Sequence, residues 1–205
     1  MRRILKEKQL KILDDFKEEF KEKHGKDARY DDLRGEKYHD IKVALIEEQY
    51  GICCYCMNKI EDYNSHIEHF IPQSVDYTKD LEYSNMMVSC NGYKDNRLNC
   101  GHKKDDYYDA ELISPLEPNC EENFKYSING EITTDESNIR GKKTIEVLDL
   151  DSYLLNRARK SAIYISGLFD EDFDEKKESL IEFFSKPEEG KLCPFCQAIL
   201  YCIKQ

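Results

Sequence analysis

The stretch that decides the fold is CCYCMNKIEDYNSHIEHFIPQS, residues 53–74. Three cysteines lie within its first four positions, and Glu68-His69 follows a short polar spacer just before Pro72. Cysteine, histidine and glutamate are side chains that bind metal ions in proteins. The segment therefore predicts a metal site, and the rest of the chain must indicate whether that site is structural, catalytic or both.

The overall composition is typical of a soluble cytoplasmic protein. The chain has 205 residues, 40% of them hydrophobic, which suffices for one compact domain with its own core. No apolar run approaches the ~18 residues that a membrane helix needs, so we expect no membrane partner. The start of the chain alternates charged and apolar side chains, unlike a signal peptide. In a reducing compartment, nine cysteines favour metal binding over disulfides.

Hydrophobic periodicity divides the chain into three segments, residues 1–50, 51–110 and 111–205. The first and third show apolar residues at helical spacing. The middle segment loses that period and gathers most of the cysteines and histidines. We therefore expect an α+β fold, in which helices from both ends of the chain pack around a small metal-site core.

The expected elements follow from apolar spacing for helices, strand-like composition for strands and Asn129-Gly130 for a hairpin turn. The expected helices cover Arg2–Lys23, Glu36–Tyr50 and residues 141–150, 151–169, 174–186 and 194–204. The expected strands are SHIEHFI (65–71) and NMMVSC (85–90). Asp151 or Ser152 is the expected N-cap of the helix over 151–169.

The first expected site is a structural zinc held by four cysteines. Cys53-x-x-Cys56 places two thiolates on one tight turn, where both reach a Zn²⁺ ion at about 2.3 Å. Cys90 and Cys100 are the expected second pair, although the polar stretch between them is longer than in a usual C-x-x-C. Cys54 competes with Cys53, and we favour Cys53 because it has the usual spacing. The alternative is a set of buried, reduced, metal-free cysteines.

The remaining cysteines give weaker signals. Cys193-x-x-Cys196 has zinc or redox spacing, but it stands at the start of an apolar helix, and Cys202 completes no recognisable set. We expect these three, and also Cys120, to pack as small hydrophobic side chains.

The second expected site combines Glu68, His69, Asn85 and His102, in that order between the cysteine pairs. Hydrolysis of a phosphodiester needs a base near neutral pH, which histidine supplies. It also needs a divalent cation, for which Glu68 and His102 are suitable ligands. Neighbours on a regular strand face opposite ways, so Glu68 and His69 share a site only if the strand bends near Pro72. The alternative is surface or core histidines without a catalytic role.

The pieces CCYC, IEHFIPQS, YSNMMVSC and CGHKKDD resemble the HNH endonucleases, whose ββα-metal core is often held by four zinc cysteines. This resemblance covers residues 53–106. The helical flanks and the segment ISPLEPNCEENFKYSINGEI resemble the HNH component of retron-associated and Septu-type bacterial anti-phage systems. In those systems the nuclease works beside an ABC/SMC-like ATPase. The resemblance implies a metal-dependent nuclease of cellular defence, with nucleic acid as substrate and such an ATPase as partner.

The resemblance also implies a role for each residue of the second site. His69 is the general base that activates water. Glu68 and His102 bind the catalytic Mg²⁺ or Mn²⁺. Asn85 orients the His69 ring or fixes the loop around it.

Two departures from the family pattern leave the third metal ligand open. The second cysteine pair is stretched, and His102 lies two residues after Cys100. Asn99 and His66 are therefore further candidates for the metal. Lys103 or Lys104 is the expected contact to phosphate.

Two functional classes stay open, a nuclease and a catalytically silent zinc module that acts as a protein-interaction subunit. The net charge of −11 argues against a simple nucleic-acid-binding module, whose affinity comes from neutralising phosphates. A bound cation, a local basic patch or a basic partner must then supply positive charge. Residues 10–20 and 153–169 are candidate partner surfaces, and the alternative is that they pack on this protein's own core.

Overall fold

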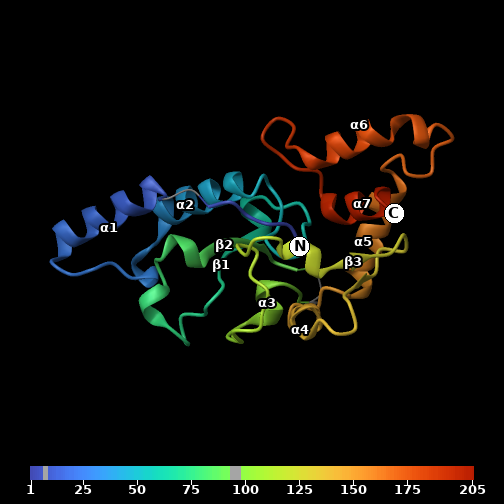
Figure 1. Cartoon of the computed structure of the whole chain (residues 1–205). Helices are drawn as coiled ribbons and strands as arrows, with labels where there is room; N and C mark the ends of the chain where they lie inside the picture. Colours follow the sequence, from blue (N-terminus) through green and yellow to red (C-terminus); the bar gives the residue numbers. More distant parts are fainter. Residues whose placement is uncertain (7–8, 93–97) are drawn as a thin grey trace.

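The computed structural model describes residues 1–6, 9–92 and 98–205, and it confirms the α+β prediction (Figure 1). Its helices are α1 (Lys11–His24), α2 (Gly35–Glu48), α3 (Gly101–Lys104), α4 (Ile139–Val147), α5 (Tyr153–Tyr164), α6 (Phe173–Ser185) and α7 (Cys196–Ile203). Its strands form two antiparallel hairpins, β1 (Ser65–His69) with β2 (Met86–Cys90), and β3 (Lys125–Tyr126) with β4 (Ile132–Thr133).

The β1–β2 hairpin occupies the middle of the molecule (Figure 1). Its register pairs Ser65 with Cys90 at one end and His69 with Met86 at the other. Helices α1 and α2 lie toward one end of the molecule, and α5, α6 and α7 toward the other. All five residues of β2 are buried, which explains why that strand reads MMVSC rather than as an alternation of polar and apolar residues.

The hairpin predicted at Asn129-Gly130 is present as β3 and β4. Gly130 adopts a φ of 83°, a left-handed value that favours glycine. A Cβ on Gly130 would also lie only 2.1 Å from the carbonyl oxygen of Asn156 in α5. Both the turn and the close approach of α5 therefore require glycine at this position.

The helix predicted from Arg2 is wrong for its first turns, because α1 begins only at Lys11. Residues 1–6 have no regular secondary structure. Met1 is fully buried, and the Ile4 N–H donates to the carbonyl of Pro115 at 2.8 Å. These tertiary contacts override the helical spacing of the first apolar residues. Residues 7–8 of the predicted helix lie outside the described residues.

The other predicted helices are present, with shifted ends. The helix predicted over 151–169 ends at Tyr164, because the Ser166 hydroxyl donates to the Ile163 carbonyl at 2.7 Å and Gly167 takes a φ of 89°. Ser152 is its N-cap residue, without a side-chain capping bond.

The buried core takes residues from all three segments predicted from the sequence, including Leu45, Val88 and Leu200. None of the helices in the described residues has the length and apolar content needed to cross a membrane.

Candidate functional site

Four cysteine side chains converge beside the β1–β2 hairpin. Cys53 and Cys56 precede β1, Cys90 ends β2, and Cys100 immediately precedes α3. All four are buried, and their Sγ atoms lie within 4.8 Å of one another. Tetrahedral zinc with bonds of about 2.3 Å needs sulfur atoms about 3.8 Å apart. The Sγ atoms of Cys56 and Cys90 are 3.7 Å apart, so the residues fit a structural zinc, and Cys54 lies outside the set.

Amide N–H groups surround the sulfur atoms. The Cys90 amide donates to Cys53 Sγ at 3.4 Å, and the Asn58 amide donates to Cys56 Sγ at 3.4 Å. The Asn99 side chain donates to Cys100 Sγ at 3.0 Å. Such donors stabilise thiolate ligands and fix their orientation. Asn99, a candidate ligand for the second metal, therefore lies against the cysteine cluster instead.

Burial raises the pKa of the Cys56 and Cys100 thiols well above the ordinary cysteine value. Neighbouring thiol groups add to the effect, since like charges cannot gather in a buried space without a cation. In the metal-free cluster, Cys56 and Cys100 therefore hold their protons tightly, and a bound cation would displace them.

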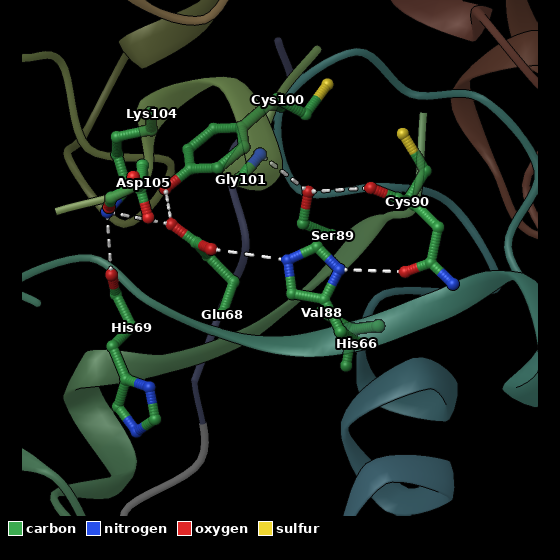
Figure 2. A network of polar contacts seen from close by, with 12 residues as sticks. His66, Glu68, His69, Val88, Ser89, Cys90, Cys100, Gly101, Lys104 and Asp105 are labelled. Carbon is green, nitrogen blue, oxygen red and sulfur yellow. Dashed lines mark hydrogen bonds and ion pairs between the residues drawn. The ribbon is translucent and has the colours of Figure 1, made fainter. Parts of the chain in front are cut away.

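Glu68 is the centre of a second cluster, on the face of β1 that α3 covers (Figure 2). Its side chain is buried, and its Oε1 accepts from the Tyr55 hydroxyl at 3.0 Å and pairs with Lys104 Nζ at 3.0 Å. Its Oε2 lies 3.5 Å from His66 Nε2. Burial alone would raise the pKa of Glu68, but hydrogen bonding to His66 and the charge of Lys104 outweigh burial and lower it.

His66 and His102 complete this charged cluster. Because His66 lies two residues before Glu68 on the same strand, both side chains face the same way. Its ring stacks on that of His102 from α3, with centroids 4.1 Å apart, and its Nδ1 lies 2.9 Å from Asn91 Oδ1. The structure thus brings together Glu68, His102 and His66. Among the described residues, only the four cysteines have ligand atoms all within 4.8 Å of one another, so these three side chains are neighbours rather than a closed ligand set.

Gly101 joins the two clusters at the start of α3. A Cβ there would lie 2.3 Å from Glu68 Oε2 and 2.7 Å from His66 Nε2, so only glycine fits. Its amide donates to the Ser89 hydroxyl of β2 at 3.0 Å. The residue before it is the cluster ligand Cys100, and the residue after it is His102. Gly101 therefore lies at the junction of the cysteine cluster and the charged cluster.

His69 points away from Glu68, toward the other face of the hairpin (Figure 2). The strand stays paired as far as His69 and Met86, so it does not bend in the way that a shared site for Glu68 and His69 requires. His69 Nε2 lies 2.7 Å from the carbonyl of Asp80, and the ring of Tyr30 stands edge-on to it, with centroids 4.5 Å apart. Burial lowers the pKa of His69. A carbonyl only accepts hydrogen bonds, so Nε2 carries the proton and Nδ1 holds the lone pair.

Asn85 fixes the loop between the two strands. Its Nδ2 donates to the carbonyls of Ile71 and Lys79, each at 3.0 Å, and its Oδ1 accepts from the Ile71 amide at 2.8 Å. Of the two roles that the resemblance implies for Asn85, these contacts fit the fixing of the loop. The loop in turn presents the Asp80 carbonyl to His69.

No family model matches this chain, and no curated protein is significantly similar to it. The resemblance to HNH endonucleases therefore rests on the quoted residues themselves. What stands independently of that resemblance is an α+β fold with a buried cluster of four cysteines that fits zinc.

The two lysines considered for phosphate differ in exposure. Lys104 is 2% exposed and donates to the His69 carbonyl at 3.0 Å besides pairing with Glu68, so its ammonium faces the interior. Lys103 is exposed on α3. The structure thus leaves Lys103 as the candidate for a phosphate contact.

The remaining cysteines lie apart from the four-cysteine cluster. Cys120, Cys196 and Cys202 are buried, and Cys193 is half-buried, as expected for residues that pack on the core. Among the described residues, no further group of ligand atoms includes them.

Sequence reasoning missed several residues of the site. Tyr55 and Ser89 carry no motif of their own, and their contacts appear only when β1, β2 and α3 are assembled. His66 could have been ranked higher, because a spacing of two on a predicted strand puts it on the same face as Glu68. Asp80 acts through its backbone carbonyl, which no side-chain pattern reveals.

Proposed function

We propose that this chain is a metal-dependent HNH-type nuclease that hydrolyses phosphodiester bonds of nucleic acid. The observation that carries the proposal is that His66, on β1, contacts both Glu68 of the same strand and His102 of α3, beside the four-cysteine cluster. Glu68 and His102 are 34 positions apart in the sequence, and their residue types alone led us to expect them in one site.

His69 acts as the general base in this proposal. That role requires the end of β1 to bend when metal and substrate bind, because His69 and Glu68 face opposite sides of the strand in this structure (Figure 2). The bond to the Asp80 carbonyl keeps the proton on Nε2, so Nδ1 is the atom that accepts a proton from water. A lowered pKa keeps the imidazole neutral near neutral pH, as a base requires. Asn85 contributes by holding the loop that carries Asp80.

Glu68 and His102, with His66, would hold the divalent cation. One carboxylate and two imidazoles suit Mn²⁺ and related ions, whereas Mg²⁺ prefers oxygen ligands. Lys104 pairs with Glu68 Oε1 at 3.0 Å, so Oε2, which lies beside His66, is the Glu68 oxygen that would hold the cation. When bound, the cation would stabilise negative charge on the phosphate and on the leaving oxygen.

A specific observation favours the alternative, a catalytically silent zinc module. Glu68 is satisfied by Tyr55, Lys104 and His66, and His69 faces the opposite side of the hairpin. In that case the charged cluster stabilises the fold, and the helices act as the surface for a protein partner.

Cleavage assays separate the two functions. The purified chain is incubated with Mg²⁺ or Mn²⁺ and with plasmid, single-stranded DNA or bulk RNA. His69→Ala should abolish cleavage and leave the zinc content unchanged, whereas His24→Ala, at the end of α1, should leave both unchanged. Cleavage at the wild-type rate by His69→Ala would refute the general-base role. No cleavage of any substrate, with or without the partner described below, would favour the silent module.

We also propose that the nuclease works in a bacterial anti-phage system beside an ABC/SMC-like ATPase. This part of the proposal is supported by the resemblance and by the charge of −11, which makes unaided binding to phosphates weak. We expect little cleavage by the isolated chain at moderate salt and strong stimulation by the ATPase. Vigorous, salt-tolerant cleavage that no partner changes would contradict it.

A further inference from the structure

The ring of His69 is held from outside the β1–β2 hairpin itself. Its Nε2 donates to the backbone carbonyl of Asp80, which lies in the loop between β1 and β2. The orientation of the ring therefore depends on where this loop is fixed. Asn85 fixes one side of it through the Lys79 carbonyl at 3.0 Å.

The other side of the loop is fixed by the segment between α1 and α2. The side chain of Asp80 is 6% exposed, and its Oδ2 accepts from Arg29 Nε at 2.8 Å and from the Tyr30 amide at 3.1 Å. Arg29 also donates through Nη2 to the Tyr77 carbonyl at 2.6 Å, and its guanidinium lies 4.6 Å from the centre of the Tyr77 ring. One arginine thus holds both ends of the short stretch 77–80.

Tyr30 adds a direct contact with the imidazole. Its ring stands at 89° to that of His69, with centroids 4.5 Å apart. The backbone of Arg29 is in turn fixed, because its amide donates to Asp32 Oδ2 at 2.9 Å within the 3-10 helix η1 (Tyr30–Asp32). The segment 29–32 therefore contacts both the ring of His69 and the residue that accepts its hydrogen bond, Asp80.

We infer that Arg29, Tyr30 and Asp80 are positioning residues, through which the segment between α1 and α2 sets the tautomer and orientation of His69. A neutral imidazole carries one proton, and the Asp80 carbonyl selects Nε2 for it only while the loop stays in place. The buried Asp80 carboxylate keeps the loop in place only while Arg29 pairs with it, since an unpaired buried carboxylate is strongly disfavoured. The catalytic meaning of this inference rests on the proposed function, but the geometry does not.

The tautomer of His69 can be measured without any substrate. In ¹⁵N-histidine-labelled protein, long-range ¹H–¹⁵N spectra distinguish protonated from unprotonated ring nitrogens, and His69→Ala identifies the signal among five histidines. The wild-type protein should show protonated Nε2 and unprotonated Nδ1. Arg29→Met and Asp80→Asn should shift the signals toward a mixture of tautomers. Arg29→Lys, which keeps the charge but not the forked contacts, should lie between them and the wild type.

Lys21→Met is the matched control, because it removes an exposed ion pair, to Asp27 at 2.9 Å, from the same part of the chain. It should leave the tautomer and the cleavage rate unchanged. In the cleavage assay, Arg29→Met should lower kcat at least about tenfold, with little change in KM. Zinc content and thermal unfolding show whether each variant remains folded.

Two results would overturn the inference. One is a wild-type His69 protonated on Nδ1. The other is a folded Arg29→Met or Asp80→Asn variant with the wild-type tautomer. Both outcomes can be measured even if the chain cleaves no nucleic acid. In that event the proposed function fails, while the tautomer still decides whether the segment 29–32 positions His69.

Discussion

The cysteine cluster and the charged cluster are built from the same three elements, yet they balance charge in opposite ways. Both draw residues from β1 or its preceding turn, from β2 or its end, and from the start of α3. The charged cluster contains its own cation, because Lys104 pairs with the buried Glu68. The four cysteines accept from amides and lie beside the Ser89 hydroxyl, but among the described residues no cationic side chain is paired with their sulfur atoms, so as thiolates they would carry negative charge without a directly bound cation. The cysteine cluster therefore depends on a bound metal ion for its positive charge, whereas the charged cluster is stable without a ligand.

The largest effect should come from removing a cysteine ligand. We expect about one zinc per wild-type chain and loss of that zinc in Cys90→Ser, with reduced solubility and a much lower melting temperature, because a structural zinc site contributes directly to folding. Metal analysis and thermal unfolding measure both effects. Cys193→Ser, which changes a half-buried cysteine outside the cluster, is the control and should keep its zinc. Wild-type protein purified without zinc under reducing, chelator-free conditions would refute the assignment.

The next largest effect should come from removing the internal cation. Lys104→Met leaves the Glu68 carboxylate buried without its cation, which should cost about 3–5 kcal/mol of unfolding free energy. Denaturant unfolding measures it. The double variant Glu68→Gln/Lys104→Met should recover a large part of the loss, because no charge is then left buried. If the two single variants simply add, the pair does not act as a unit.

Gly101→Ala tests the junction of the two clusters. The added methyl would meet Glu68 Oε2 and His66 Nε2, so we expect a loss of about 1–3 kcal/mol in stability. Zinc should stay bound, since the methyl points at the charged cluster. Chemical denaturation with parallel metal analysis checks both statements. Loss of zinc would show that the clusters are coupled more tightly than their separate contacts imply.

The pH dependence of zinc binding should follow from the raised pKa of the Cys56 and Cys100 thiols. Protons compete with zinc for the thiolates, and a raised thiol pKa means that the protons bind the sulfur atoms more tightly. Zinc affinity should therefore fall continuously as the pH is lowered from 8 toward 5, and zinc binding should release protons. Titration with a chromophoric chelator at several pH values measures the fall. An affinity independent of pH would mean that the ligands are not these thiols.

The smallest effect should come from Asn99→Ala, which removes the side-chain donor to Cys100 Sγ. Loss of such a contact lowers metal affinity by about 10–100-fold without unfolding the protein. Competition with the same chelator gives the ratio of affinities. An unchanged affinity would show that the amide only fills space beside the sulfur.

The cysteine cluster could be predicted from the sequence because its signal is local. Cys53-x-x-Cys56 forces both sulfur atoms onto one turn, and Cys90 and Cys100 supply the other pair. The identical spacing of Cys193 and Cys196 shows the limit of that signal, because no second pair meets them among the described residues. C-x-x-C spacing predicts two of the four ligands, and the fold decides whether a second pair of cysteines lies beside them.

The charged cluster could be predicted only in part. The residue types Glu68 and His102 were readable, but the burial of Lys104 depends on α3 packing against β1. The surroundings of His69 could not be predicted for a similar reason. Its hydrogen-bond partner is a backbone carbonyl, and its neighbour Tyr30 comes from another segment. Residues 1–6 illustrate the same physics, because tertiary contacts replaced the helix that their spacing predicts.

The course of residues 1–6 has a consequence for how the protein is made. Ile4 binds to Pro115, and Arg2 donates to the carbonyl of Ser185 at 2.9 Å, so these first residues dock on segments synthesised more than a hundred positions later. Contacts across such sequence distances form slowly, because a long loop must close first. On the ribosome, residues 1–6 must therefore wait undocked until Ser185 has emerged. Docking of residues 1–6 would be one of the last steps of folding, and the space that Met1 fills would stay open to water until then.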